Sequence, residues 1–247
     1  MLRSSHTYPP LNVLKPVAED VWIVDGPAIR FGYAWPKLSF PTRMTVIRLS
    51  SGALFVHSPT KLTEDLRYAV ESLGPISHIV GPNRIHYWWI PQWRAAFPEA
   101  QIWLAPHIRE QAGARIDFPA HDIEAETGYP WDGDIETIIA PGDFMSEADF
   151  FHVASRTLVL TDLIENFEPK KLGSWPMRLL YRLGGVVDPH GSMPRDMRLT
   201  FRATKPDLRR AVERMIALDP QRVILAHGRW YTCDGAQELK RAFAWLL

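Results

Sequence analysis

The chain has 247 residues, 46% of them hydrophobic and 23% charged, which is enough apolar material for one sizeable core. Its 28 Lys and Arg balance its 28 Asp and Glu, so no overall field favours nucleic acid or an anionic membrane as a partner. The single cysteine, Cys233, excludes an internal disulfide scaffold, and the sequence has neither a signal-peptide core nor an apolar run of about 18 residues. We therefore expect a soluble, cytoplasmic protein that binds a small-molecule substrate or ligand, with its oligomeric state left open.

The first half of the chain mixes strands with helices. Apolar, β-branched runs predict strands at 21–24, 44–49 and 53–57, and Ser50-Ser51-Gly52 predicts a hairpin between the last two. Residues 27–41 are predicted to form a loop. Thr63 is a good N-cap for a helix that ends at Gly74 and Pro75. We then expect a strand at 78–80, an aromatic helix at 86–96 and a strand at 102–104.

The second half begins with an irregular segment, 109–134, and returns to strands at 135–139, 149–153 and 157–161. Residues 163–203 are so often interrupted by Pro and Gly that we expect a lid or insertion there, with one short helix at 177–183. An amphipathic helix at 207–218, a buried strand at 223–226 and a helix at 236–246 close the chain. As one domain over 1–247, these elements fit either a four-layer α/β sandwich or an ordinary α/β fold.

Polar side chains follow four of the predicted strands at the point where each strand ends. They are Ser58, the pair Asn83 and His86, Asp162, and His227. Each alone is typical of a structural hydrogen bond or a cap, but strand ends are also where α/β proteins hold catalytic groups. Imidazole and carboxylate groups bind zinc, iron or manganese, and three of them with an open position can activate water. The set therefore indicates a candidate metal site.

Five segments together resemble the metallo-β-lactamase superfamily, because they occur in the order of its five motifs. A narrower likeness, carried by Pro41 to Val46, His57-Ser58-Pro59 and Pro82-Asn83, is to the uncharacterised domain-of-unknown-function family numbered 4336. The resemblance covers about residues 11 to 246 and implies an αββα sandwich. The five segments are "ALFVHSP" (53–59), "GPNRIHYWW" (81–89), "APGDF" (140–144), "TLVLTDL" (157–163) and "VILAHG" (223–228).

The first metal-binding motif departs from the superfamily pattern. Residues 81–86 occupy the place of its His-x-His-x-Asp-His signature, and only His86 matches. Gly81 and Asn83 stand in place of histidines, and Ile85 stands in place of the aspartate. Since Ile85 cannot bind a metal and Asn83 offers only a neutral amide oxygen, the resemblance does not imply a full dinuclear site.

The later motifs match better. Asp162 corresponds to the bridging aspartate of the superfamily and His227 to its last histidine, while Asp143 takes the usual histidine position after Pro141-Gly142. The resemblance thus implies a mononuclear site of His86, Asp162 and His227, joined by Asp143, or else an inherited pocket that holds no metal. The expected ion is zinc, with iron and manganese as alternatives.

Two functions follow as hypotheses. In the first, the protein is a metal-dependent hydrolase of an ester, thioester or lactone-type bond, with His86 and Asp162 serving catalysis. Substrate would contact Asn83, Arg43 and Trp89. The alternative role for Arg43 is an internal salt bridge. In the second, the protein is not an enzyme and binds a small ligand or a protein partner through the Trp-rich segment 87–93 and the loop 163–194. Whether the chain is an enzyme stays open at this point, because a fold does not fix a reaction.

Overall fold

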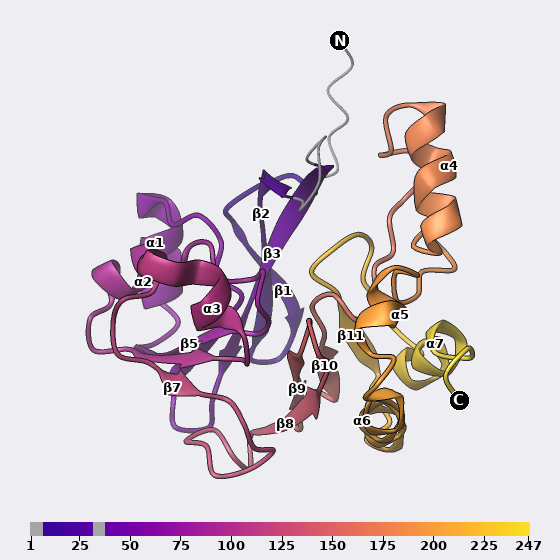
Figure 1. Ribbon diagram of the computed structural model, residues 1–247. Coiled ribbons are helices and arrows are strands. Elements are labelled where there is room, and N and C mark those ends of the chain that lie inside the picture. The colour runs from indigo at the N-terminus through magenta and orange to yellow at the C-terminus, as the bar shows by residue number, and fades with distance from the viewer. Residues whose placement is uncertain (1–6, 32–37) are drawn as a thin grey trace.

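The computed structural model of the chain describes residues 7–31 and 38–247. Two β-sheets face each other, and helices cover the outer side of each sheet (Figure 1). This four-layer αββα arrangement confirms the sandwich that the motif order implies. Within the described ranges, no helix is both long enough and apolar enough to cross a membrane.

The first sheet contains seven strands that lie side by side in chain order, antiparallel from β1 to β4 and parallel from β4 to β7. Three helices cover its outer side (Figure 1), and Thr63 caps the first of them by accepting a hydrogen bond from the Leu66 amide. The strands are β1 (Leu14–Ala18), β2 (Val21–Phe31), β3 (Leu38–Arg48), β4 (Leu54–His57), β5 (Ile76–Gly81), β6 (Gln101–Leu104) and β7 (His121–Asp122), and the helices are α1 (Glu64–Glu71), α2 (Ile90–Ala96) and α3 (Ile108–Ala112), with a 3₁₀ turn at Gly113–Arg115.

The second sheet has the strand order β11-β10-β9-β8, with β10 and β11 parallel to each other. The long connection between those two strands carries α4, which projects from the body of the molecule, as well as α5 and α6 (Figure 1). Helices α6 and α7 cover the outer face of the sheet. The elements are β8 (Ile135–Ala140), β9 (Glu147–His152), β10 (Thr157–Val159), α4 (Trp175–Gly184), α5 (Met197–Thr200), α6 (Lys205–Ala217), β11 (Arg222–Ile224) and α7 (Gly235–Ala242).

The main hydrophobic core joins the two sheets. Phe55 of β4 packs edge-on against Trp131 and against Phe150 of β9, with ring centroids 4.9 and 5.0 Å apart. A second core lies between the outer face of β8–β11 and helices α6 and α7. Because the inner faces of both sheets share one core, the strand ends of the two sheets are held at fixed positions relative to each other.

Two local predictions differ from the structure, and a third is confirmed with wider bounds. The loop predicted for 27–41 is wrong at both ends, because β2 and β3 continue to pair past an irregularity after Gly26, with Ile29 opposite Phe40; residues 32–37 lie outside the described part of the chain. The aromatic helix begins at Ile90 rather than at residue 86, since Pro91 favours the first helical turn and Trp89 is the N-cap. The helix predicted at 177–183 is confirmed and extends over Trp175–Gly184.

Candidate metal site

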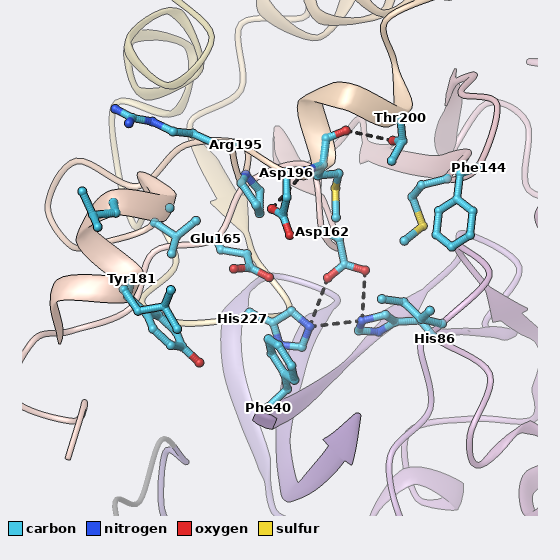
Figure 2. A pocket seen from close by; sticks show the side chains of 18 of the residues that line it. Phe40, His86, Phe144, Asp162, Glu165, Tyr181, Arg195, Asp196, Thr200 and His227 are labelled. Carbon is cyan, nitrogen blue, oxygen red and sulfur yellow. Dashed lines mark hydrogen bonds and ion pairs between the residues drawn. The ribbon is translucent and has the colours of Figure 1, made fainter. Parts of the chain in front are cut away.

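Three side chains from the carboxyl ends of strands in both sheets meet at one edge of the sandwich. His86 follows β5 of the first sheet, whereas Asp162 and His227 follow β10 and β11 of the second. Parallel strands present their carboxyl ends at the same edge of a sheet, so β10 and β11 bring Asp162 and His227 together. Figure 2 shows the three side chains pointing toward one another. We call them the His-Asp-His triad.

The distances within the triad suit one divalent ion. The Nε2 atom of His86 lies 3.3 Å from Oδ2 of Asp162, and the Nε2 atom of His227 lies 3.1 Å from Oδ1 of the same carboxylate. The two Nε2 atoms are 3.2 Å apart. Ligands that bind zinc at 2.0–2.1 Å with tetrahedral angles are separated by about 3.3 Å. The triad is also the group of His, Cys, Asp and Glu side chains in the described residues whose ligand atoms are close enough to share a metal. The residues present therefore fit the metal that the sequence motifs imply.

Ser58 orients the first histidine of the triad. Its Oγ atom lies 2.8 Å from Nδ1 of His86, so an Nδ1–H of His86 can donate to it while Nε2 keeps its lone pair for a ligand. Ser58 directly follows β4 and has a φ of 49°, a left-handed conformation that is uncommon for a residue other than glycine. Backbone strain of this kind persists where the surrounding structure holds it, and here it places the hydroxyl against His86.

A buried cluster of three residues lies behind the triad, and two of them, Asn83 and Glu147, support Asp162. The Nδ2 atom of Asn83 donates to Asp162 at 2.7 Å and to Glu147 at 2.9 Å. Glu147 also accepts the amides of Thr161, Asp162 and Leu163. We call Asn83, Glu147 and the neighbouring Asp149 the buried carboxyl cluster. It fixes the backbone at the point where β10 delivers Asp162 to the triad.

The carboxyl groups of the site differ in charge. Burial raises the pKa of Asp149 well above its usual range, and the negative charge of Glu147 raises it further. Burial and the charge of Asp162 also raise the pKa of Glu147. Burial would also raise the pKa of Asp162, but the charges of His86 and His227 and their hydrogen bonds outweigh burial and hold the pKa well below its usual range. Asp162 is therefore ionised, as a metal ligand must be.

The segment that carries His227 is held by a buried arginine. Arg43 of β3 pairs with Asp25 at 2.7 Å and donates hydrogen bonds to the backbone carbonyls of Leu225 and Gly228. Gly228 has a φ of 87°, and a Cβ atom there would lie 2.2 Å from the carbonyl oxygen of Asn166. Only glycine fits this close approach, so Gly228 is required by the packing of the two loops.

A pocket of about 760 Å³ opens beside the triad. Most of its lining is apolar, but Glu165 also faces it and is only 9% exposed. Burial raises the pKa of Glu165 to about 8, and the positive charge of His227 opposes this shift only in part. Figure 2 shows Glu165 between the triad and Tyr181 of α4. At neutral pH this side chain holds a proton next to the candidate metal site.

The structure places four other predicted site residues outside the triad and its pocket. Asp143 is exposed and is not part of the candidate metal group, because its backbone turns toward α5, where its amide donates to Thr200. Arg43 does not line the pocket beside the triad, because its guanidinium forms an internal salt bridge with Asp25. This is the alternative role predicted for Arg43. Trp89 is partly buried against the main hydrophobic core and does not line this pocket either. Asn83 is fully buried and contacts Asp162 instead of the pocket.

Two further histidines have structural roles. His57 is buried at the end of β4, where its Nε2 atom lies 3.4 Å from the hydroxyl of Thr161. Burial and the nearby charge of His86 lower its pKa to about 3, so His57 is neutral. His152 hydrogen-bonds Ser155 within the β9–β10 hairpin. The Trp-rich segment also has a packing role, because Tyr87 and Trp93 are buried in the main hydrophobic core.

Sequence reasoning missed Glu147 and Glu165. Glu147 opens β9, whose residues are otherwise largely apolar, and an acidic residue on a buried strand is a signal that could have been used. Glu165 lies three residues after Asp162, in a segment without periodicity, so nothing in the sequence indicated that it would be buried beside the triad.

Comparison with solved structures places the fold among metallo-β-lactamases. The lactamase DIM-1 matches with a TM-score of 0.62 and 14% identity, over 95% of this chain and 97% of the other. FIM-1 from Pseudomonas aeruginosa, in its mono-zinc form, matches with a TM-score of 0.60 and 14% identity over 95% and 96% of the two chains. The enzyme from Hirschia baltica gives 0.59 and 15% over the same shares. At these identities the likeness shows the fold alone.

The sequence comparisons are more specific about the branch. No curated protein matches this sequence. Residues 33–173, more than half of the chain, match the model of the family described as a domain of unknown function, DUF4336. This stretch carries Ser58, Asn83, His86, Glu147 and Asp162, so it includes most of the candidate site. The chain belongs to the DUF4336 family and has the metallo-β-lactamase fold.

Proposed function

We propose that this protein is a metal-dependent hydrolase that uses one divalent ion, zinc foremost, to cleave an ester, thioester or lactone-type bond. The observation that carries the proposal is the His-Asp-His triad, whose three ligand atoms lie within 4.8 Å of one another at the mouth of a pocket. The mono-zinc form of FIM-1 is a precedent for a single ion in this fold.

When bound, a divalent ion polarises a carbonyl oxygen and lowers the pKa of a water molecule. The residues of the chain prepare the site for that chemistry. Asp162 supplies a carboxylate that stays ionised, and Asn83 fixes its orientation through the 2.7 Å hydrogen bond. Ser58 holds the His86 ring in place through its contact with Nδ1.

Glu165 is the group that can move a proton in the pocket. Its pKa of about 8 means that the carboxyl is protonated at neutral pH, when Asp162 is ionised. Two carboxyl groups whose environments separate their pKa values are suited to different roles, one as a ligand and one as an acid. We assign Glu165 to donate its proton to the leaving oxygen or sulfur of the substrate.

Elemental analysis of the purified protein, after growth in metal-replete medium, tests the metal site. We expect about one divalent ion per chain, the stoichiometry of a three-ligand catalytic site. The variants His86→Ala and His227→Ala should lose the ion, whereas His152→Ala, which removes a buried histidine outside the triad, should keep it. A native protein without metal would disprove the proposal, and metal retained in both triad variants would disprove the ligand assignment.

Hydrolysis is tested separately with p-nitrophenyl esters and an S-acyl thioester, using the zinc-loaded protein. Activity should depend on added zinc, disappear in His227→Ala and persist in His152→Ala. A zinc-loaded protein that cleaves none of these substrates would leave a metal-binding protein without the proposed activity.

A further inference from the structure

The pocket beside the triad continues along the projecting helix α4. Leu180, Tyr181, Leu183 and Gly184 of this helix line it, and Ile29 and Phe40 of the β2–β3 pair line it as well. Figure 2 shows the triad between Phe144 on one side and Tyr181 of α4 on the other. The polar triad and the apolar wall thus belong to a single cavity rather than to two separate sites.

The apolar wall is unusually open to solvent. Leu180 and Leu183 are 51% and 59% exposed although they face the pocket. Removing a leucine side chain from water is favourable, in proportion to the area covered. The pocket volume of about 760 Å³ lies in the range of small-molecule sites, most of which are apolar with a few polar groups. A ligand that covers both leucines therefore gains affinity from their burial.

We propose that this cavity binds the apolar acyl chain of the substrate, with the carbonyl at the triad and the chain along Leu180 and Leu183. The proposal rests on the hydrolase function above and narrows its substrate class to acyl esters or thioesters with a hydrocarbon chain. The apolar wall and the triad line the same pocket, so an acyl chain whose carbonyl lies at the triad extends along this wall. A polar acyl group would leave Ile29, Phe40 and the α4 leucines in contact with solvated atoms.

The first test is a chain-length series. The zinc-loaded protein is assayed with p-nitrophenyl acetate, butanoate, hexanoate, octanoate and decanoate. We expect kcat/KM to rise about threefold to fourfold for each added methylene, the factor that corresponds to ~0.8 kcal/mol per buried CH₂, until the pocket is filled. The variant Leu180→Asn should flatten this dependence.

Leu179→Asn is the matched control. Leu179 lies on the same helix and is 47% exposed, close to the exposure of Leu180, but it does not line the pocket. Both variants carry the same loss of helix propensity, so a difference between them reports on the pocket. A wild-type series without chain-length dependence, or equal series for the two variants, would overturn the assignment of the chain site.

The second test does not need activity. Binding of 1-butanol, 1-hexanol and 1-octanol to the metal-free protein is measured by titration calorimetry, and affinity should increase with chain length in wild type and Leu179→Asn but not in Leu180→Asn. A negative heat-capacity change should accompany binding. Alcohol binding of this kind without ester hydrolysis would keep the chain site and refute the hydrolase, whereas hydrolysis that ignores chain length would keep the hydrolase and refute the chain site.

Discussion

The triad and the buried carboxyl cluster are neighbours, yet the protein treats their polar groups in opposite ways. In the buried carboxyl cluster, Glu147 accepts three backbone amides and the side chain of Asn83, so its hydrogen-bonding capacity is used within the fold. In the triad, the two imidazole Nε2 atoms and the Asp162 carboxylate oxygens lie 3.1–3.3 Å from one another in the wall of the pocket. The first arrangement stabilises the chain, and the second is suited to a ligand.

This contrast separates structural from functional polar residues in the fold. A buried polar group that is satisfied by the backbone should cost stability when it is replaced. Replacing a group that faces the pocket should cost little, or should even stabilise the metal-free protein, because active sites hold unfavourable arrangements for the sake of function. Four predictions, in decreasing order of size, test this distinction.

The largest change is expected for Glu165, which faces the pocket. Its pKa is about 8 in the folded protein, against an unfolded value near 4.5, so the unfolded chain releases this proton first as the pH rises. The free energy of unfolding should therefore fall between pH 4.5 and pH 8 because of this group, by on the order of 3–5 kcal/mol. Glu165→Gln should remove the part of this pH-dependent fall in the free energy of unfolding that Glu165 causes. Denaturant unfolding of the metal-free protein at pH 5 and pH 8.5 measures it, and parallel pH profiles for variant and wild type would contradict the assigned pKa.

Replacing Glu147, behind the triad, should lower the free energy of unfolding, whereas replacing Glu165 should remove a loss of it. Glu147→Gln removes a carboxylate that accepts the amides of Thr161, Asp162 and Leu163. We expect the free energy of unfolding to fall by about 2–3 kcal/mol, because a buried donor that loses its acceptor costs its desolvation. Glu136→Gln, a change on strand β8 that affects only a surface pair with Arg214, should cost less than about 1 kcal/mol. Equal losses in both variants would mean that Glu147 has no special supporting role.

Ser58 stands between the structural polar residues and the triad, because it contacts His86 without itself belonging to the triad. Ser58→Ala should lower zinc affinity about 10- to 100-fold, the usual cost of losing a hydrogen bond to a histidine ligand. Competition with a chromophoric chelator measures the affinity, and Ser72→Ala, at the exposed end of α1, is the control. Unchanged affinity in Ser58→Ala would remove Ser58 from the site.

The weakest response is expected at Asp143, the position that the motif order indicates as a fourth ligand. Its side chain is exposed and lies outside the group of candidate ligands. Asp143→Ala should leave the metal content unchanged and should alter the free energy of unfolding by no more than about 0.5 kcal/mol. A drop in metal content would instead return Asp143 to the ligand set.

Much of the frame is predictable from the amino-acid sequence. Apolar runs and turn residues predict most of the strands and the helices α4, α6 and α7, and five motifs in family order predict the αββα sandwich and the three residues of the triad. Such prediction works because strand periodicity is local, and because a polar residue directly after a buried strand is visible in the sequence. His86, Asp162 and His227 can therefore be named from the sequence alone.

Which other polar residues belong to the site depends on the packing of the whole chain. Arg43 turns inward to Asp25, Asp143 turns outward, and Glu147 and Glu165, which the sequence does not indicate, are buried next to the triad. These positions follow from contacts between the two sheets and from the path of the β10–β11 connection. Neither is encoded in local periodicity, because the free energy of burying a charged group is set by the partners that packing places around it.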